Sequence, residues 1–202
     1  MEKKGSDIME LKEIQTSQLH SDAFTMIGKE WMLVSAERDG VVNTMTASWG
    51  GMGILWNKKV AFVFLRPQRY TKEFIDQKDC FTLSFYDEEY RKTLSYLGTV
   101  SGRDEQKIEK AGLHTAFIND APYFTEANTV LVCRKLYAQE MREDCFLDAA
   151  LIEKNYPHHG AVAFGHHAKA LYEVFKYVGV PVEEIGYNQP KGVRYPTENP
   201  WG

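Results

Sequence analysis

The sequence predicts a mainly β protein with short helices, in which antiparallel strands form a barrel-like sheet. About seven short segments are rich in β-branched and aromatic residues, the types that strands favour. Aromatic residues make up 13% of the 202-residue chain. Only two or three helical segments lie between these strands, so the pattern is not the regular strand–helix alternation of a parallel sheet. Antiparallel closure would also remove exposed strand edges.

The first half of the chain supplies a predicted hairpin and a buried strand. Residues 31–36 and 41–48 are predicted strands, and the turn Glu37–Gly40 joins them because Asp-Gly is a strong hairpin signal. Residues 49–53 are glycine-rich and are expected to break the strand pattern. Residues 60–65 are apolar throughout, which is typical of a strand buried on both faces.

The middle of the chain alternates short helices and strands. In order, we expect a helix at 71–78, a strand at 81–85, a helix at 88–97, a loop at 98–103 and a short helix up to residue 111. Thr71 is the expected N-cap of the first helix. Ser101 or Asp104 could cap the last one, and Gly112 should end it.

Towards the C-terminus the pattern becomes less regular. Strands are expected at 130–141 and 161–166, and residues 168–177 could form a strand or a helix. The tail 185–202 is rich in Pro, Asn and Gly, and its Trp201 is expected to lie against its own domain or a partner subunit. With residues 1–12 as a lead-in, the whole chain is expected to form one domain.

Composition excludes several classes of function. The formal net charge of −4 does not indicate a nucleic-acid partner, since nucleic-acid-binding proteins usually show a basic face, although local basic groups could hold one small phosphate. No signal peptide and no membrane-spanning apolar run is evident, so we expect a cytoplasmic protein. Three cysteines without regular spacing favour neither a disulfide framework nor a zinc site. Cys80 and Cys133 lie in apolar runs and are expected to be buried thiols.

The segment Asn43–Gly50 alternates small hydroxyl and apolar residues before the glycines. Small side chains let a flat ring approach the backbone, whose N–H and C=O groups can then bind its polar edge. A threonine-rich edge strand followed by a turn explains the same pattern.

The segment Arg66–Thr71 places two arginines, a tyrosine and a threonine just before a predicted helix. Free N–H groups and the helix dipole favour an anion at that end, and Arg adds donors that match phosphate geometry. The segment therefore indicates a phosphate site, although two solvated arginines in a loop would look the same.

Two further motifs have competing interpretations. Gly98–Arg103 could contact the edge of a ligand or simply connect two helices; it is neither a Walker A loop nor a Gly-x-Gly-x-x-Gly motif. His158, His159, His166 and His167 form two adjacent pairs. Neighbouring residues of a strand point to opposite faces and no Cys or carboxylate cluster completes a site, so we expect surface imidazoles and no metal. Neither hydrolase motif, Gly-x-Ser-x-Gly or His-Glu-x-x-His, is present.

Taken in order, the segments 43–50, 65–71 and 98–103 resemble the flavin reductase-like family of FMN-binding split barrels, which includes flavoredoxins. The resemblance extends from about residue 31 to about residue 172. It implies an antiparallel, Greek-key-like split β-barrel, a homodimer and bound FMN. The residues that it implies for cofactor binding are Met45, Thr46, Ala47, Ser48 and Trp49 at the flavin ring, Arg66, Arg69, Tyr70 and Thr71 at the phosphate, and Thr99, Ser101 and Gly102 over the flavin.

The resemblance also implies a reaction. A flavin reductase passes hydride from NADH or NADPH to flavin, and the electrons go on to free flavin, oxygen or a redox protein. No side chain need act as acid or base, so no catalytic residue is predicted. One departure from the family is that His166 stands where members commonly have an acid. The alternatives are an FMN-holding electron carrier without a nicotinamide site and, further away, a module for another flat ligand such as haem.

Overall fold

The structure, a computed structural model, describes residues 11–15, 18–19, 22–155 and 168–179. The strands are β1 (Lys12–Ile14), β2 (Met32–Arg38), β3 (Val41–Ala47), β4 (Gly50–Leu55), β5 (Lys58–Leu65), β6 (Cys80–Phe85), β7 (Thr115–Ile118), β8 (Ala121–Phe124), β9 (Thr129–Glu140) and β10 (Ala168–Gly179). The α-helices are α1 (Ala23–Thr25), α2 (Tyr70–Gln77), α3 (Arg91–Thr99), α4 (Lys107–Lys110) and α5 (Ala149–Asn155). A π-helical turn, η2 (Met26–Glu30), and two 3-10 turns, η3 (Glu88–Tyr90) and η4 (Glu143–Cys145), complete the elements of the described residues.

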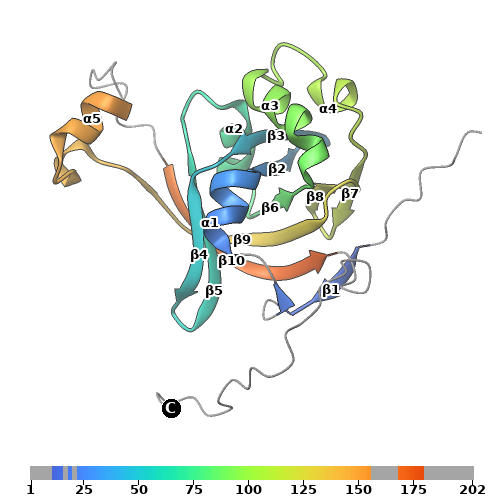
Figure 1. Cartoon of the computed structure of the whole chain (residues 1–202), viewed down its shortest axis with the longest axis horizontal. Coiled ribbons are helices and arrows are strands. Elements are labelled where there is room, and N and C mark those ends of the chain that lie inside the picture. Colours follow the sequence, from blue (N-terminus) through green and yellow to red (C-terminus); the bar gives the residue numbers. More distant parts are fainter. Residues whose placement is uncertain (1–10, 16–17, 20–21, 156–167, 180–202) are drawn as a thin grey trace, which may run out of the picture.

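One antiparallel sheet dominates the molecule. Its strand order is β3-β2-β6-β9-β10-β5-β4, and β1 pairs with β10. The two end strands, β3 and β4, follow each other in the chain and are joined only by Ser48 and Trp49. The sheet must therefore curve until its two edges approach at that link, and Figure 1 shows this curvature. The predicted fold class, mainly antiparallel β with a few short helices, is confirmed.

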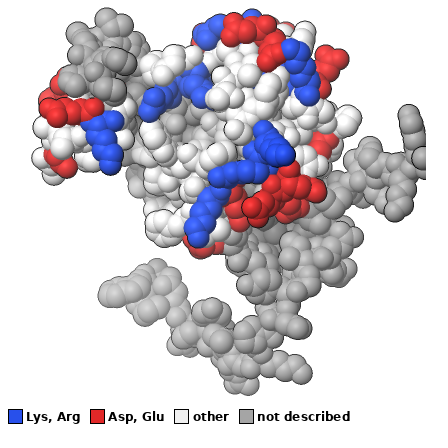
Figure 2. All heavy atoms as spheres, turned by 45° about the horizontal axis from the view of Figure 1, so that its top comes forward, with Lys and Arg blue, Asp and Glu red and all other residues white. Residues whose placement is uncertain are grey.

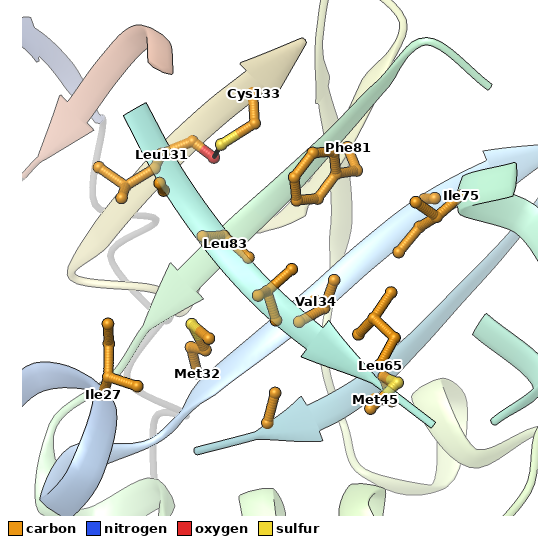
Figure 3. Packing of buried hydrophobic residues seen from close by; sticks show 14 of the residues in the cluster. Ile27, Met32, Val34, Met45, Leu65, Ile75, Phe81, Leu83, Leu131 and Cys133 are labelled. Carbon is orange, nitrogen blue, oxygen red and sulfur yellow. Dashed lines mark hydrogen bonds between the residues drawn. The ribbon is translucent and has the colours of Figure 1, made fainter. Parts of the chain in front are cut away.

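A hydrophobic core fills the inside of the curved sheet. Figure 3 shows Met32 and Val34 of β2 pointing into it together with residues from β3, β5, β6 and β9. Leu33, between them, packs instead into a second cluster on the opposite face. Helix α3, α4 and the β7–β8 hairpin supply the other side of that second cluster. Strand β2 is buried on both faces for this reason, and it fixes the position of its neighbour β3.

Two tight hairpin turns join the edge strands β3 and β4 to their neighbours β2 and β5. Asp39 and Gly40 both have positive φ, 52° and 80°, which is the type I′ geometry expected from Asp-Gly. Trp56 and Asn57 have φ of 52° and 56° and form the same kind of turn between β4 and β5. This second turn contains no glycine, so the sequence signal for it is weak.

Replacing Gly40 with alanine should lower the free energy of unfolding by about 1–2 kcal/mol, because a Cβ is strained at φ +80°. Gly28→Ala is the matched control, since its φ is not positive and nothing lies within 4 Å of the added Cβ. Urea denaturation of both variants measures the difference. Equal stability of the two variants would contradict a left-handed turn at Gly40.

The predicted glycine-rich break at 49–53 is wrong, because β4 begins at Gly50 and pairs with β5. A Cβ at Gly50 would overlap the carbonyl oxygen of Phe62, and one at Gly51 would overlap the Phe62 ring. These glycines therefore permit close approach of two strands, a known use of glycine within a strand.

Several boundaries also differ from the expectations. Arg69 occupies the N-cap position of α2, so Thr71 is not the N-cap. The Arg69 side chain makes no capping hydrogen bond. Gly98 and Thr99 belong to α3, although a loop was predicted there. The N-cap residue of α4 is Gln106, so neither of the two expected N-caps, Ser101 and Asp104, holds that position. A Cβ at Gly98 would lie 3.2 Å from that of Thr46, so glycine at this position allows α3 to pack closely against β3.

In the later part of the chain, the observed elements agree in outline with the predicted ones. Strand β9 agrees with the prediction to within one residue at each end, and residues 168–179 form a strand. The predicted strand 161–166, the four histidines, the lead-in up to residue 10 and the tail 185–202 lie outside the described residues. The β7–β8 hairpin and α5, which stands away from the sheet in Figure 1, were not predicted.

The described cysteines are free thiols. Cys133 is buried as predicted, and burial raises the pKa of its thiol. Cys80 is only partly buried, because β6 begins there and its side chain lies at the edge of the second cluster. The described residues contain no helix with the length and apolarity to cross a membrane.

Candidate functional site

A pocket of about 460 Å³ lies along β3, a volume in the range of small-molecule sites. Four segments form its walls: β3 with the link to β4, the end of β5 with the chain leading into α2, the end of α3 with the loop after it, and the start of α4. The lining residues are Met45, Thr46, Ala47, Ser48, Trp49, Phe64, Arg66, Gln68, Arg69, Tyr70, Thr71, Gly98, Thr99, Val100, Ser101, Gly102 and Lys107.

All twelve residues that the sequence singled out line this one pocket. Five lining residues were not predicted: Phe64, Gln68, Gly98, Val100 and Lys107. Gln68, Gly98 and Val100 lie within the segments already singled out, and Phe64 directly precedes one of them. No local pattern marks Lys107, since its place in the pocket depends on how α4 packs against α3.

The edge of β3 forms one wall. Consecutive residues of a strand point to opposite faces, so the run Met45–Trp49 can line one pocket only along the strand's edge. Among the described residues β3 pairs with β2 alone, which leaves backbone N–H and C=O groups on the other edge. Met45 and Ala47 are buried, while the Thr46 hydroxyl donates to the Leu94 carbonyl at 2.5 Å and ties β3 to α3.

The chain leading into α2 and the first turn of this helix form another wall. The Lys72 N–H donates to the Arg69 carbonyl at 2.9 Å, and no side chain caps the helix. The other amides of the first turn have no carbonyl four residues earlier within the helix, so they are suited to bind an anion. Burial lowers the pKa of Arg69, and the nearby charge of Arg66 lowers it further. The Arg66 guanidinium also lies 5.2 Å from the centre of a Trp49 ring.

The charge of the lining is one-sided. Three lining residues, Arg66, Arg69 and Lys107, are cationic, and no Asp or Glu lines the pocket. Lys107 is only 3% exposed, and burial together with Arg69 lowers its pKa to about 8. Charged groups are costly to bury without a counter-ion. The pocket is therefore suited to a ligand that carries negative charge.

Polar side chains of β3 and α2 meet near Thr71. The Asn43 side-chain amide donates to the Thr71 hydroxyl at 3.1 Å, which leaves the Thr71 O–H to donate elsewhere. A Cβ at Gly102 would overlap Asn43 Oδ1, so glycine is needed where this loop crosses β3. The Ser101 hydroxyl accepts from the Arg103 N–H at 3.2 Å. The Thr99 hydroxyl bonds to carbonyls within α3, so its capacity to donate is already used.

The ring of Tyr70, a lining residue, lies close to two arginines. The guanidinium of Arg103 lies 4.4 Å from the Tyr70 ring centre and that of Arg38 lies 5.8 Å from it. Both arginines pair with Glu73. On the face shown in Figure 2, most basic side chains lie beside acidic ones and form several separate groups.

No metal site is evident among the described residues, where no group of three or more His, Cys, Asp or Glu side chains gathers. The two histidine pairs lie in the part of the chain that is not described.

A family model described as "Flavin reductase like domain" matches residues 26–167. Solved structures agree with it in fold. An FMN-binding domain of a flavin reductases-like enzyme from Shewanella baltica OS155 has a TM-score of 0.61 and 17% identity, over 85% of this chain and 78% of that one. Flavoredoxin of Desulfovibrio vulgaris (Miyazaki F) has a TM-score of 0.58 and 21% identity, over 84% and 78%.

Nitrilotriacetate monooxygenase component B from Bacillus cereus is similar as well, with a TM-score of 0.58 and 18% identity over 79% of this chain and 71% of that one. At these identities the likeness establishes the fold. No curated protein sequence matches the chain.

Proposed function

This chain belongs to the flavin reductase-like family, and on that premise we propose that its pocket binds FMN and that the protein is an NAD(P)H-dependent flavin reductase. The observation that carries the proposal is the pocket lining: a free strand edge, and three cations without an acid, of which Arg66 and Arg69 lie next to the start of α2. A flat polar ring with a phosphate-bearing chain has complementary chemistry to both walls.

The proposed placement follows the walls. The flavin ring lies against the edge of β3 from Met45 to Trp49, where backbone groups bind its polar atoms. The phosphate lies at the start of α2, where Arg66, Arg69 and the Thr71 hydroxyl donate to it. The loop with Ser101 and Gly102 covers the ring-to-phosphate chain.

When bound, FMN would supply the redox chemistry by accepting hydride from a nicotinamide. The protein's own residues bind, orient and shield it from water. No side chain of the described pocket is needed as an acid or base, so we assign none. Free flavin, oxygen or a redox protein would take the electrons.

Two experiments test the proposal. Purified protein should show flavin absorbance, or should quench the fluorescence of added FMN; a colourless protein that quenches none would refute the FMN site. The FMN-loaded protein should then lose its yellow colour on anaerobic mixing with NADH or NADPH. If only dithionite bleaches it, the protein is an electron carrier and the reductase assignment is wrong.

We also propose a homodimer. Large apolar side chains on the β4–β5 hairpin are exposed, with Ile54 at 71% and Trp56 at 62%, and Trp49 at the pocket is 44% exposed. Covering such residues is a common reason for association. Light scattering of the full chain should give twice the monomer mass, and a monomer at micromolar concentration would refute this proposal.

A further inference from the structure

Lys107 is the only charged residue among the buried side chains of the described residues. It begins α4 and is 3% exposed. Its Nζ donates to the Leu97 carbonyl at 3.0 Å and to the Val100 carbonyl at 2.8 Å. These carbonyls lie at the end of α3, where helix carbonyls lack partners within the helix. One ammonium group therefore fastens α4 to the end of α3.

Lys107 also lines the pocket proposed for the cofactor. Residues 98–102, which include its acceptor Val100, line the same pocket. An ammonium group has three N–H donors, and two of them are used on Leu97 and Val100. The third donor and the charge remain for a ligand in the pocket.

No described acid neutralises Lys107. The charged group that acts on it is Arg69, which repels it, and Arg66 lines the same pocket. Glu105, in the turn before α4, is bonded to the Tyr96 hydroxyl and pairs with Lys110. Burial, followed by Arg69, lowers the pKa of Lys107 to about 8.

Resting on the proposed function, we propose that Lys107 couples cofactor binding to the end of α3 and the loop after it (residues 97–102): a phosphate entering the pocket fixes Lys107 as an ammonium ion, with uptake of a proton above neutral pH, and the charged group then holds this segment at the pocket. The proton comes from solvent and stays on Nζ. An anion favours the charged form of a neighbouring amine, so the bound protein keeps the proton that the free protein loses as pH rises.

The affinity for FMN should fall as the pH rises. Above about pH 8 the free pocket holds mostly the neutral amine, and binding must then include protonation. The affinity for FMN should fall about tenfold between pH 7 and pH 9. The phosphate itself contributes little, since its second ionisation is complete near pH 7 (pKa about 6). Riboflavin has the same ring and no phosphate, so its affinity should change little and controls for ionisation of the ring.

The test uses the full chain with FMN and riboflavin as probes. Calorimetry at pH 8.5 in two buffers of different ionisation enthalpy should show uptake of roughly 0.7–0.8 proton with FMN and almost none with riboflavin. Lys107→Arg keeps the charge at every pH tested, so it should bind FMN with no proton uptake and no pH dependence. Lys107→Met should bind FMN weakly at both pH values and take up no proton.

The outcomes separate the two proposals. A wild-type protein that binds no FMN at pH 7 refutes the proposed function. One that binds FMN with equal affinity at pH 7 and pH 9 refutes only the role of Lys107, as does Lys107→Arg with unchanged pH dependence. If both variants fail to fold, the wild-type comparison of FMN with riboflavin still decides. If Lys107 has only a structural role, its substitution should weaken FMN and riboflavin binding alike, and the wild-type protein should take up no proton when FMN binds.

Discussion

Arg69→Ala is expected to weaken FMN binding about 100-fold, equivalent to about 2.7 kcal/mol, and to leave riboflavin binding nearly unchanged. Arg69 is the N-cap residue of α2, and burial lowers the pKa of its guanidinium, so its charge lacks sufficient compensation inside the protein. Removing one member of a desolvated charge pair commonly costs 2–5 kcal/mol. Since riboflavin has no phosphate, the lost interaction should not concern it.

Fluorescence titration with both ligands measures this difference. Arg142→Ala is the matched control, because Arg142 is exposed, pairs with Asp144 and does not line the pocket. It should bind both ligands as the wild type does. If Arg69→Ala weakens FMN and riboflavin equally, Arg69 does not bind the phosphate and acts only on the shape of the pocket.

The order of the three motifs was enough to predict which segments meet. Arg66–Thr71 had a physical reason of its own, since two cations before a helix suit an anion, and both arginines do line the pocket at the start of α2. Asn43–Gly50 and Gly98–Arg103 were assigned through the resemblance. The structure brings these segments to the same pocket, while their contacts with FMN stay a prediction.

What the sequence missed depends on contacts between distant residues. Gly50 and Gly51 looked like a break, but they allow β4 to lie close to Phe62 of β5. Gly98 looked like part of a loop, but it packs inside α3 against Thr46. Lys107 was not singled out from the sequence at all. Only the packing of α4 on α3 reveals that it is buried, because local patterns carry no information about which carbonyls a side chain will reach.

The core and the proposed phosphate site share α2. Thr71, which lines the pocket, and Phe74 and Ile75, which lie in the core, are all buried on this eight-residue helix. Phe74 is fully buried, and its ring meets that of Tyr70 edge to face at 4.9 Å. The Arg38 guanidinium lies 4.5 Å from the Phe74 ring. A helix of two turns has little stability by itself, so its packing must hold the start of α2 in place.

Phe74→Ala should therefore lower both stability and FMN affinity. Removing a buried phenylalanine costs about 3–5 kcal/mol of unfolding free energy, measurable by urea denaturation. The cavity would also free the first turn of α2 to move, so we expect FMN affinity to fall about tenfold in protein that is still folded. Phe74→Leu, which fills most of the space, should recover the larger part of both losses.

Phe81→Ala separates the two effects. Phe81 is 1% exposed in the same core cluster, but it lies on β6 and does not line the pocket. Its loss should cost a similar amount of stability and leave FMN affinity within about twofold of the wild type. If both alanine variants weaken FMN alike, general loosening of the core is responsible. If Phe74→Ala alone does so, the effect passes through α2, because Phe74 holds in place the helix turn that carries the proposed phosphate donors.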